Sequence, residues 1–268
     1  MNNNKSHISP LRLYRHYISI ILKSSMQYKT SFFLFVVGQF LVSFNVFLGV
    51  FFMFQRFHTV KDFSFQEVVL CFSIVLLEFS LAEMYARGFD SFPSMVRKGD
   101  FDRILLRPRG AVLQVLGSRF ELTRIGRMLQ SVLMFLYAVG NGEVQWTADK
   151  ILTVVLMLAG GSAFFTAMFV IGAAFSFFTT EGLEFMNVFT DGAREYGKYP
   201  FSVYGERFLW ITTFLFPYAL VQYYPLLYLL GRRDNPLLIF LPMAAALFLI
   251  PAYLFWRVGV RHYKSTGS

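Results

Sequence analysis

Long runs of apolar residues most constrain this chain, since several exceed the roughly 18 residues that an α-helix needs to cross a membrane. More than half of the 268 residues are hydrophobic and 34 are Phe, which a soluble domain of this size would not need. The sequence therefore predicts an all-α integral membrane protein. We expect six transmembrane helices near residues 31–54, 66–88, 120–139, 151–178, 208–230 and 236–256.

The Lys and Arg residues between these runs predict the orientation, because basic loops tend to stay in the cytoplasm. With the N-terminus inside, 20 of the 25 basic residues fall in inside connections and 5 fall outside. We therefore expect a multi-pass protein with both termini in the cytoplasm. The predicted division is a segment 1–30, a transmembrane domain 31–256 and a cytoplasmic tail 257–268.

The segment Pro10–Lys29 has apolar residues on one helical face and basic residues on the other. An amphipathic helix ahead of a span lies in the membrane interface, either as a simple anchor or as a regulatory element. Basic residues on this side also attract anionic membrane lipid. This attraction is a sufficient explanation for most of the net charge of +9. The sequence offers no folded basic surface with base-reaching groups, so nucleic acid is not an expected partner.

Between the second and third runs lies Ser91–Arg109, which is too polar to enter a bilayer and too short to form a domain. Pro93 and Pro108 bracket a short apolar-periodic stretch, and the Gly99–Asp100 pair predicts a bend. These features predict a short helix held across the membrane surface. It is either an ordinary charged loop or a docking element for a soluble partner.

Five prolines interrupt the last two runs, between Phe208 and Trp256. Broken helices in lipid need neighbouring protein or a cavity to satisfy their freed carbonyl groups. We therefore interpret Tyr218–Leu230 as a helical hairpin that re-enters from the outer face. A single kinked helix is the alternative.

Patterns for enzyme chemistry are incomplete in this sequence. Gly192–Lys198 is similar to a nucleotide-binding P-loop, but Tyr199 replaces the hydroxyl residue that would hold the metal. The four His residues lie outside the runs, so Ser162 has no base, and the adjacent Gly160–Gly161 pair favours close helix packing. Cys71 is the only Cys, and no cluster has metal-ligand spacing. We expect no catalytic residue and no bound metal, and therefore no enzyme activity.

Two carboxylates, Glu78 and Glu83, lie in the second run and point to different sides of its helix. Glu83 has Arg87 four residues later, which predicts an ion pair along the helix. Glu78 has no such partner near the middle of the bilayer, so it must face protein or water. It is either a protonated structural residue or part of a substrate or ion pathway.

The first run carries an aromatic face formed by Phe44, Phe47 and Phe51, with Asn45 beside it. Such a face packs on other helices or on lipid, or it lines a cavity that suits a large amphipathic cargo. In the second case these four residues would line a substrate pathway together with Glu78.

Three blocks of sequence resemble the ABC-2 type permeases, in the subgroup of six-span bacterial exporter permeases. The blocks are Gly99–Pro108 (GDFDRILLRP), Tyr199–Gly205 (YPFSVYG), and Ala219–Pro225 (ALVQYYP) followed by Tyr228–Gly231 (YLLG). The resemblance covers essentially the whole chain from Leu11 onward. The subgroup often has Asn where Gln222 stands.

The resemblance implies a half-transporter of the bacterial cytoplasmic (plasma) membrane that exports an unidentified substrate. Two such permeases, identical or related, would pair and bind two copies of a separate ABC-type ATPase. That ATPase would hold ATP and Mg²⁺, so this chain would bind no cofactor itself.

The resemblance also implies roles for two segments. The segment between spans two and three would be the coupling helix, with Phe101 and Ile104 as an apolar plug in the ATPase. Its residues would be Gly99, Asp100, Phe101, Asp102, Arg103 and Ile104. The hairpin would close the outer exit. Its gate residues would be Gln222, Tyr223, Tyr224 and Pro225.

Two other classes of protein remain as alternatives. An ion-coupled secondary carrier would use Glu78, although carriers usually show paired repeats and the two halves of this chain show no self-similarity. A non-transporting membrane scaffold subunit is the second alternative. It does not explain the cost of keeping Glu78 in a span.

Overall fold

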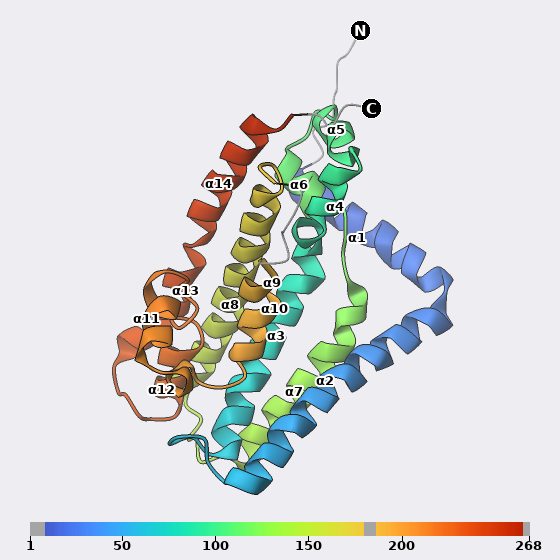
Figure 1. Cartoon of the computed structure of the whole chain (residues 1–268). Helices are drawn as coiled ribbons and strands as arrows, with labels where there is room; N and C mark the ends of the chain where they lie inside the picture. The colour runs from blue at the N-terminus through green and yellow to red at the C-terminus, as the bar shows by residue number, and fades with distance from the viewer. Residues whose placement is uncertain (1–8, 180–185, 265–268) are drawn as a thin grey trace.

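A computed structural model describes residues 9–179 and 186–264 of the chain. In these residues the fold is all-α, and the only strand-like pairing is an isolated bridge between Val60 and Phe63. The long helices run side by side along one axis (Figure 1). At one end lies the connection between α2 and α3, which we call the α2–α3 end. At the opposite end lie α4 and α5, and we call this the α4–α5 end.

Four helical segments of the described residues are long and apolar enough to cross a membrane. They are α2 (Lys29–Phe57), α3 (Phe65–Asp90) continued by α4 (Phe92–Arg97), α8 (Ala148–Phe175), and the row η4 (Pro236–Phe240), α13 (Leu241–Ala246) and α14 (Leu249–His262). Pro236 and Pro242 stand in the first turns of η4 and α13, which explains why this last row is divided.

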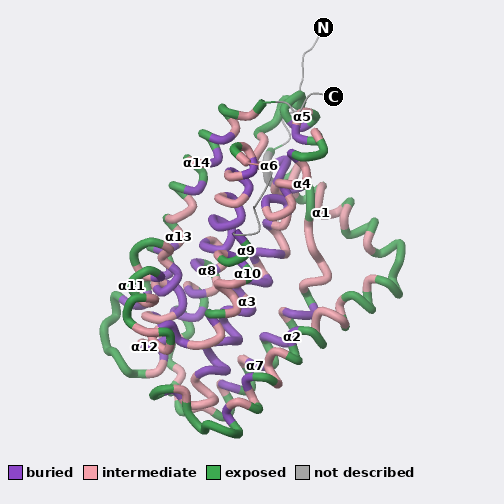
Figure 2. Tube along the Cα trace, in the orientation of Figure 1, coloured by how far each residue is buried: buried purple, intermediate pink, exposed green. Residues whose placement is uncertain are grey.

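Helix α3 occupies the centre of the bundle. It packs most closely against α8 on one side and against α7 (Ile125–Asn141) on the other. In the most apolar stretch of the segment formed by α3 and α4, 78% of the residues are buried. In the corresponding stretch of α2, only 11% are buried (Figure 2). The apolar face of α2 is therefore left for lipid or for another protein.

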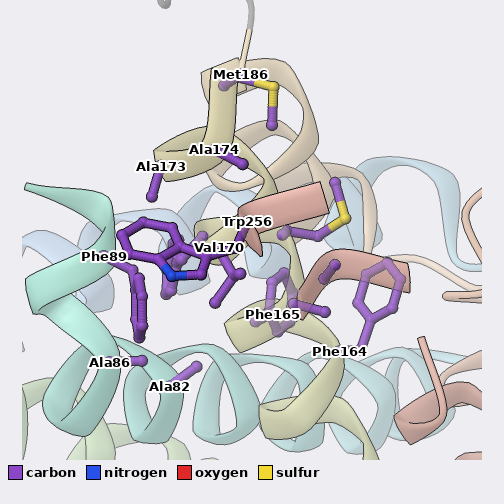
Figure 3. Packing of buried hydrophobic residues seen from close by; sticks show 14 of the residues in the cluster. Ala82, Ala86, Phe89, Phe164, Phe165, Val170, Ala173, Ala174, Met186 and Trp256 are labelled. Atoms are coloured by element: carbon purple, nitrogen blue, oxygen red, sulfur yellow. The ribbon is translucent and has the colours of Figure 1, made fainter. Parts of the chain in front are cut away.

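Small residues set the closest helix approaches. A Cβ atom at Gly126 of α7 would lie 2.0 Å from the carbonyl oxygen of Val36 in α2, and one at Gly160 of α8 would lie 2.3 Å from that of Pro242. The prediction of close helix packing at Gly160–Gly161 is confirmed. Around Trp256 of α14, rings and small side chains fill the space between α3 and α8, and Phe89 lies 5.3 Å away, centroid to centroid (Figure 3).

The N-terminal helix forms where the amphipathic pattern predicts it. Helix α1 spans Pro10–Gln27, and the Ser9 side chain caps it by accepting a hydrogen bond from the Arg12 backbone N–H at 3.3 Å. The chain turns at Tyr28 before α2, and the two helices form a wedge at the side of the bundle (Figure 1).

The third predicted span, 120–139, begins later than expected. The 3₁₀ turn η1 (Leu122–Arg124) precedes α7, whose 17 residues keep it outside the four long apolar segments. Its apolar residues still follow a helical period, and Met134 and Ala138 belong to the buried cluster around α3.

The prediction of a membrane-spanning helix over 208–230 is wrong. Helix α11 (Glu206–Phe214) ends after nine residues, and the chain reverses before α12 (Tyr223–Leu229). The backbone N–H of Ala219 donates to the Thr212 carbonyl at 2.7 Å, which closes the reversal. Pro217 lies in the reversal, where it cannot donate a backbone hydrogen bond. The predicted hairpin, Tyr218–Leu230, covers only part of the reversal and α12, because the first limb is α11; we call α11, the reversal and α12 the hairpin.

The segment before the hairpin also differs from the prediction. The predicted spans leave Arg194–Arg207 in a cytoplasmic connection, but α10 (Asp191–Tyr196) packs on α3, between α9 (Met186–Phe189) and η3 (Phe201–Tyr204) in the chain. The Arg194 guanidinium lies 4.9 Å from the Phe79 ring centroid, and the Lys61 ammonium donates to the Ser202 carbonyl at 2.6 Å. The segment therefore runs beside α3 in the opposite direction, toward the α2–α3 end.

Candidate functional site

The α4–α5 end carries the bend predicted from the sequence. Gly99 has a positive φ of 72° between α4 and α5 (Asp100–Leu105), a conformation that favours glycine. The short helix α6 (Ala111–Leu116) follows and returns the chain toward the bundle. The result is a compact turn of two short helices at the end of α3.

The predicted apolar plug is not exposed, which corrects the expectation for Phe101 and Ile104. Phe101 has no exposed surface, and its ring lies 4.9 Å from that of Phe92 and 5.1 Å from that of Tyr263. Ile104 is only 8% exposed, and the Gln114 side-chain amide donates to its carbonyl at 3.1 Å. These residues hold the turn against the bundle.

The exposed apolar residues of this turn are instead Leu105 and Leu106, which are 46% and 85% exposed. Asp100 and Arg103 are exposed beside them, with 4.0 Å between their charged groups. Asp102 faces the C-terminal segment, where burial together with this carboxylate raises the pKa of Tyr263 to about 12. The turn thus presents an apolar tip with a charged rim.

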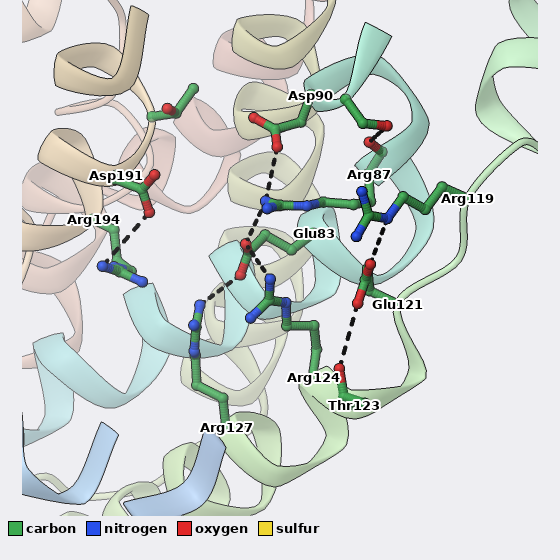
Figure 4. A network of polar contacts seen from close by, with 12 residues as sticks. Glu83, Arg87, Asp90, Arg119, Glu121, Thr123, Arg124, Arg127, Asp191 and Arg194 are labelled. Carbon is green, nitrogen blue, oxygen red and sulfur yellow. Dashed lines mark hydrogen bonds and ion pairs between the residues drawn. The ribbon is translucent and has the colours of Figure 1, made fainter. Parts of the chain in front are cut away.

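A buried ionic cluster is centred on Glu83 of α3 and includes arginines of η1 and α7 (Figure 4). Glu83 pairs with Arg87 at 2.8 Å, as predicted, and also with Arg124 at 3.2 Å and Arg127 at 2.5 Å. The amide oxygen of Gln39 in α2 accepts from Arg124 at 2.7 Å and from Arg127 at 3.0 Å. Sequence spacing revealed the Arg87 pair but not the others, which are about 40 residues away along the chain.

Glu78 points to the opposite side of α3 and packs on α8. It has no exposed surface, and among the described residues neither of its carboxylate oxygens has a hydrogen-bond partner. A Cβ atom at Gly161 would lie 2.2 Å from the Glu78 carboxyl carbon. The two carboxylates of α3 therefore have contrasting surroundings, as their angular separation predicts.

Gln222 lies at the end of the hairpin reversal and is fully buried. Its amide nitrogen donates to the carbonyls of Gly197 at 3.1 Å and Tyr199 at 2.8 Å, and it lies 2.9 Å from the Cys71 sulfur. These carbonyls belong to a stretch of non-helical backbone beside α3. Such backbone lacks the internal hydrogen bonds of a helix. Gln222 thus supplies hydrogen bonds that this segment lacks.

The other predicted gate residues lie in the first turn of α12. The rings of Tyr223 and Tyr224 are partly exposed and lie 5.3 Å apart, while Pro225 is buried. The Tyr224 hydroxyl lies 3.2 Å from that of Thr213 in α11. This contact joins the two limbs of the hairpin.

A group of contacts that sequence analysis missed ties the hairpin to the α2–α3 end. The Arg232 guanidinium, just after α12, contacts both oxygens of Glu67 at 2.8 Å and donates to the Asp62 carbonyl at 2.6 Å. It also lies 4.3 Å from the Phe63 ring centroid. We call these residues the Arg232 cluster. Its signals in the sequence are the Ser64–Glu67 capping box that begins α3 and the basic residues of the short turn after α12.

The Arg232 cluster borders a polar cavity of about 460 Å³ between α3, α7 and the end of the hairpin. Charged and amide side chains line it, including Gln66, Glu67, Asn141, Glu143 and Arg232.

The aromatic face of α2 forms a continuous row. Phe44 and Phe47 lie 5.9 Å apart, Phe47 and Phe51 lie 6.5 Å apart, and Phe65 of α3 lies 5.7 Å from Phe51. Phe44 and Asn45 are exposed. The structure therefore brings the predicted residues together on α2, with Phe47 and Phe51 half-buried against Phe65 of α3.

Comparison with known proteins gives one assignment. A family model described as ABC-2 family transporter protein matches residues 40–267. No curated protein and no solved structure matches the chain. Among the described residues, no group of three or more His, Cys, Asp or Glu side chains is placed to hold a metal ion.

Proposed function

The chain belongs to the ABC-2 family of transporter proteins, and from this premise we propose that it is the permease half of an ATP-driven exporter. It is a membrane-embedded transport component, and the family implies an ABC-type ATPase as its partner. The finer proposal is a bacterial cytoplasmic-membrane complex of two permeases, identical or related, with two ATPase copies. ATP and Mg²⁺ are held by the ATPase.

The observation that carries this proposal is the exposed tip at the α4–α5 end. Leu106 is 85% exposed, whereas a leucine at the end of a bundle gains from a partner that removes it from water. With Asp100 and Arg103 as its rim, the tip suits a shallow cleft on a soluble protein. In this proposal Leu105 and Leu106 replace Phe101 and Ile104 as the apolar contact with the ATPase.

The proposal includes six crossings of the membrane. The four long apolar segments would be the first, second, fourth and sixth crossings, α7 the third, and the broken segment 186–204 beside α3 the fifth. Irregular backbone at membrane depth needs protein around it, and α3 together with Gln222 supplies this. The α4–α5 end and both chain termini are then cytoplasmic.

The hairpin in this proposal enters the membrane from the outer side and closes the exit. Both of its ends lie near the α2–α3 end, through the Lys61–Ser202 and Arg232–Glu67 contacts. Its reversal lies deep in the bundle, where the Tyr218 ring stacks on that of Phe164 at 5.1 Å. Tyr223, Tyr224 and Pro225 begin the limb that returns outward.

The substrate pathway in this proposal runs along α2, because this helix has the least covering. Phe44, Asn45, Phe47 and Phe51 would face the second permease or the substrate, and an aromatic row suits an amphipathic molecule. Glu78 lies on the far side of α3 from this row and contacts α8 instead.

Co-purification of the ATPase tests the proposal. We expect Leu106→Ala to insert normally but to weaken ATPase association by about tenfold or more, since truncating a central apolar contact costs on the order of 2 kcal/mol. Lys98→Ala, on the same turn but away from the tip, is the matched control and should bind normally. A chain that leaves the membrane without any ATPase would favour a secondary carrier or a scaffold and refute the proposal.

A further inference from the structure

Three buried polar side chains without full hydrogen bonding gather between α3 and the hairpin. Among the described residues, both carboxylate oxygens of Glu78, the hydroxyl of Tyr218 and the amide oxygen of Gln222 have no partner. None of the three side chains has more than 2% of its surface exposed. Buried polar atoms are rarely left unpaired, so this concentration calls for an explanation.

Within residues 9–179 and 186–264, no ion pair with Glu78 is formed. From α8, Gly161 lies directly against its carboxyl group, and Phe164 and Phe165, three and four residues further along α8, are buried. From the hairpin, Tyr218 covers the same region and packs on both of these rings, at 5.1 and 5.0 Å. From α3 itself, Cys71 and Tyr85 lie about two turns away on either side.

Two arginines lie over the ring of the neighbouring Phe79, and each pairs with a carboxylate other than Glu78. Arg127 pairs with Glu83 at 2.5 Å. Arg194 of α10 pairs with Glu195 at 2.9 Å and Asp191 at 3.6 Å. Glu78 is therefore surrounded by aromatic rings, glycine backbone and neutral polar groups.

An ionised carboxylate in such surroundings is costly by several kcal/mol, whereas the neutral acid is much less so. The neutral form also offers an O–H donor to the oxygen atoms that lack one, in Tyr218 or Gln222. These surroundings favour the neutral acid over the carboxylate.

We propose that Glu78 is a proton-binding site whose access to water is controlled by the hairpin. While Tyr218 at the reversal is seated, the carboxyl group keeps its proton. When the hairpin withdraws toward the α2–α3 end, water reaches Glu78, its O–H bond breaks, and the proton passes to water. The hairpin can then reseat over Glu78 only after a proton has been taken up again.

This inference rests on the proposed function for the movement of the hairpin but not for the protonation itself. The two are therefore tested separately, on the purified whole chain in lipid nanodiscs without nucleotide. Variants are compared only where their helical circular dichroism matches that of the unaltered protein.

The first test is infrared difference spectroscopy at neutral pH. The spectrum of the Glu78→Gln variant is subtracted from that of the unaltered protein. The difference should show the carbonyl stretch of a protonated carboxylic acid, and this band should move in D₂O. Glu143→Gln changes an exposed residue in the loop between α7 and α8. It is the control and should remove only carboxylate bands. A difference spectrum with carboxylate bands alone for Glu78 would overturn the proposal, whatever the transport activity of the complex.

The second test measures how fast the Glu78 band moves after transfer into D₂O. Arg232→Gln, which breaks the cluster that holds the hairpin, should make this exchange several times faster. Arg233→Gln is the matched control and should leave the rate unchanged. Equal exchange in all three proteins would show that the hairpin does not control the site, while leaving the assignment to the transporter family intact.

Discussion

Gly161 is the residue of α8 that lies directly against the Glu78 carboxyl group. Any side chain at this position would enter the space that the carboxyl carbon occupies, because a Cβ atom would lie 2.2 Å from it. The backbone of Gly161 is ordinary helix and does not itself require glycine. The glycine is required because Glu78 on α3 occupies the space that a side chain would fill.

We predict that Gly161→Ala lowers the stability of the chain by about 1–3 kcal/mol, the usual cost of overpacking a filled core. Thermal unfolding in detergent measures the change. Combining it with Glu78→Ala should recover part of the loss, because the two side chains compete for one space. Gly172→Ala is the control on the same helix, as a Cβ atom there meets only Met186 side-chain atoms at 3.6 Å or more. An equal loss from Gly172→Ala would argue against a specific contact at Gly161.

Phe101 and Leu106 make a second comparison at this scale. Phe101→Ala removes a fully buried ring and should cost about 3–5 kcal/mol of stability. Leu106→Ala removes an exposed side chain and should change stability by less than about 0.5 kcal/mol. Unfolding midpoints of the isolated permease separate the two effects from ATPase binding. A stable Phe101→Ala protein would restore the idea that this ring serves the partner.

The hairpin and the segment beside α3 depend on each other through Gln222. Its amide contacts two carbonyls of the non-helical backbone and the sulfur of Cys71, so one side chain joins three elements. Cys71 is the only cysteine of the chain and is buried. Its reaction with a thiol reagent therefore reports whether this junction has opened.

We predict that Gln222→Leu makes Cys71 react much faster with a membrane-permeant thiol reagent. The leucine removes the hydrogen bond to the Tyr199 carbonyl, at about 1–3 kcal/mol for a buried group, and leaves the Gly197 carbonyl with the Cys71 thiol at 3.5 Å. Gln145→Leu, in an exposed loop, should leave the reaction slow. Should Cys71 react equally slowly in both variants, the Gln222 contacts contribute little to holding the junction closed.

Among the helices and turns, the sequence predicted those that depend on residues close together in the chain. The long apolar runs gave α2, α3 and α8 to within a few residues, and the Gly99 bend followed from its dipeptide. Glu83 and Arg87 met because they are one helical turn apart. The segment 186–204 was misplaced because Asp191, Arg194 and Lys198 make it look like a loop, and its apolar partner, α3, is over 100 residues away. Phe101 was misassigned because an apolar residue in a polar segment has the same pattern whether it packs inward or outward.

For the whole molecule, the orientation in the membrane is the property to test. In a variant without Cys71, we predict that cysteines placed at Lys61 and Gln145 react with an impermeant reagent from outside, and that one at Ser94 reacts only from inside. A cysteine at Lys198 should react slowly from both sides, since this residue is partly buried and pairs with Glu195. Labelling of the Ser94 position from outside would reverse the orientation and remove the cytoplasmic docking tip.

The path of residues 186–204 beside α3 has a consequence for how the protein is made. A charged residue at the centre of a span costs on the order of 3 kcal/mol during insertion by the translocon, so this segment does not enter lipid alone. Its charges become acceptable only beside α3, where Arg194 meets Phe79 and Lys198 meets Phe72. In the proposed topology, we therefore expect this segment to insert only after α3, α7 and α8 have assembled beside it.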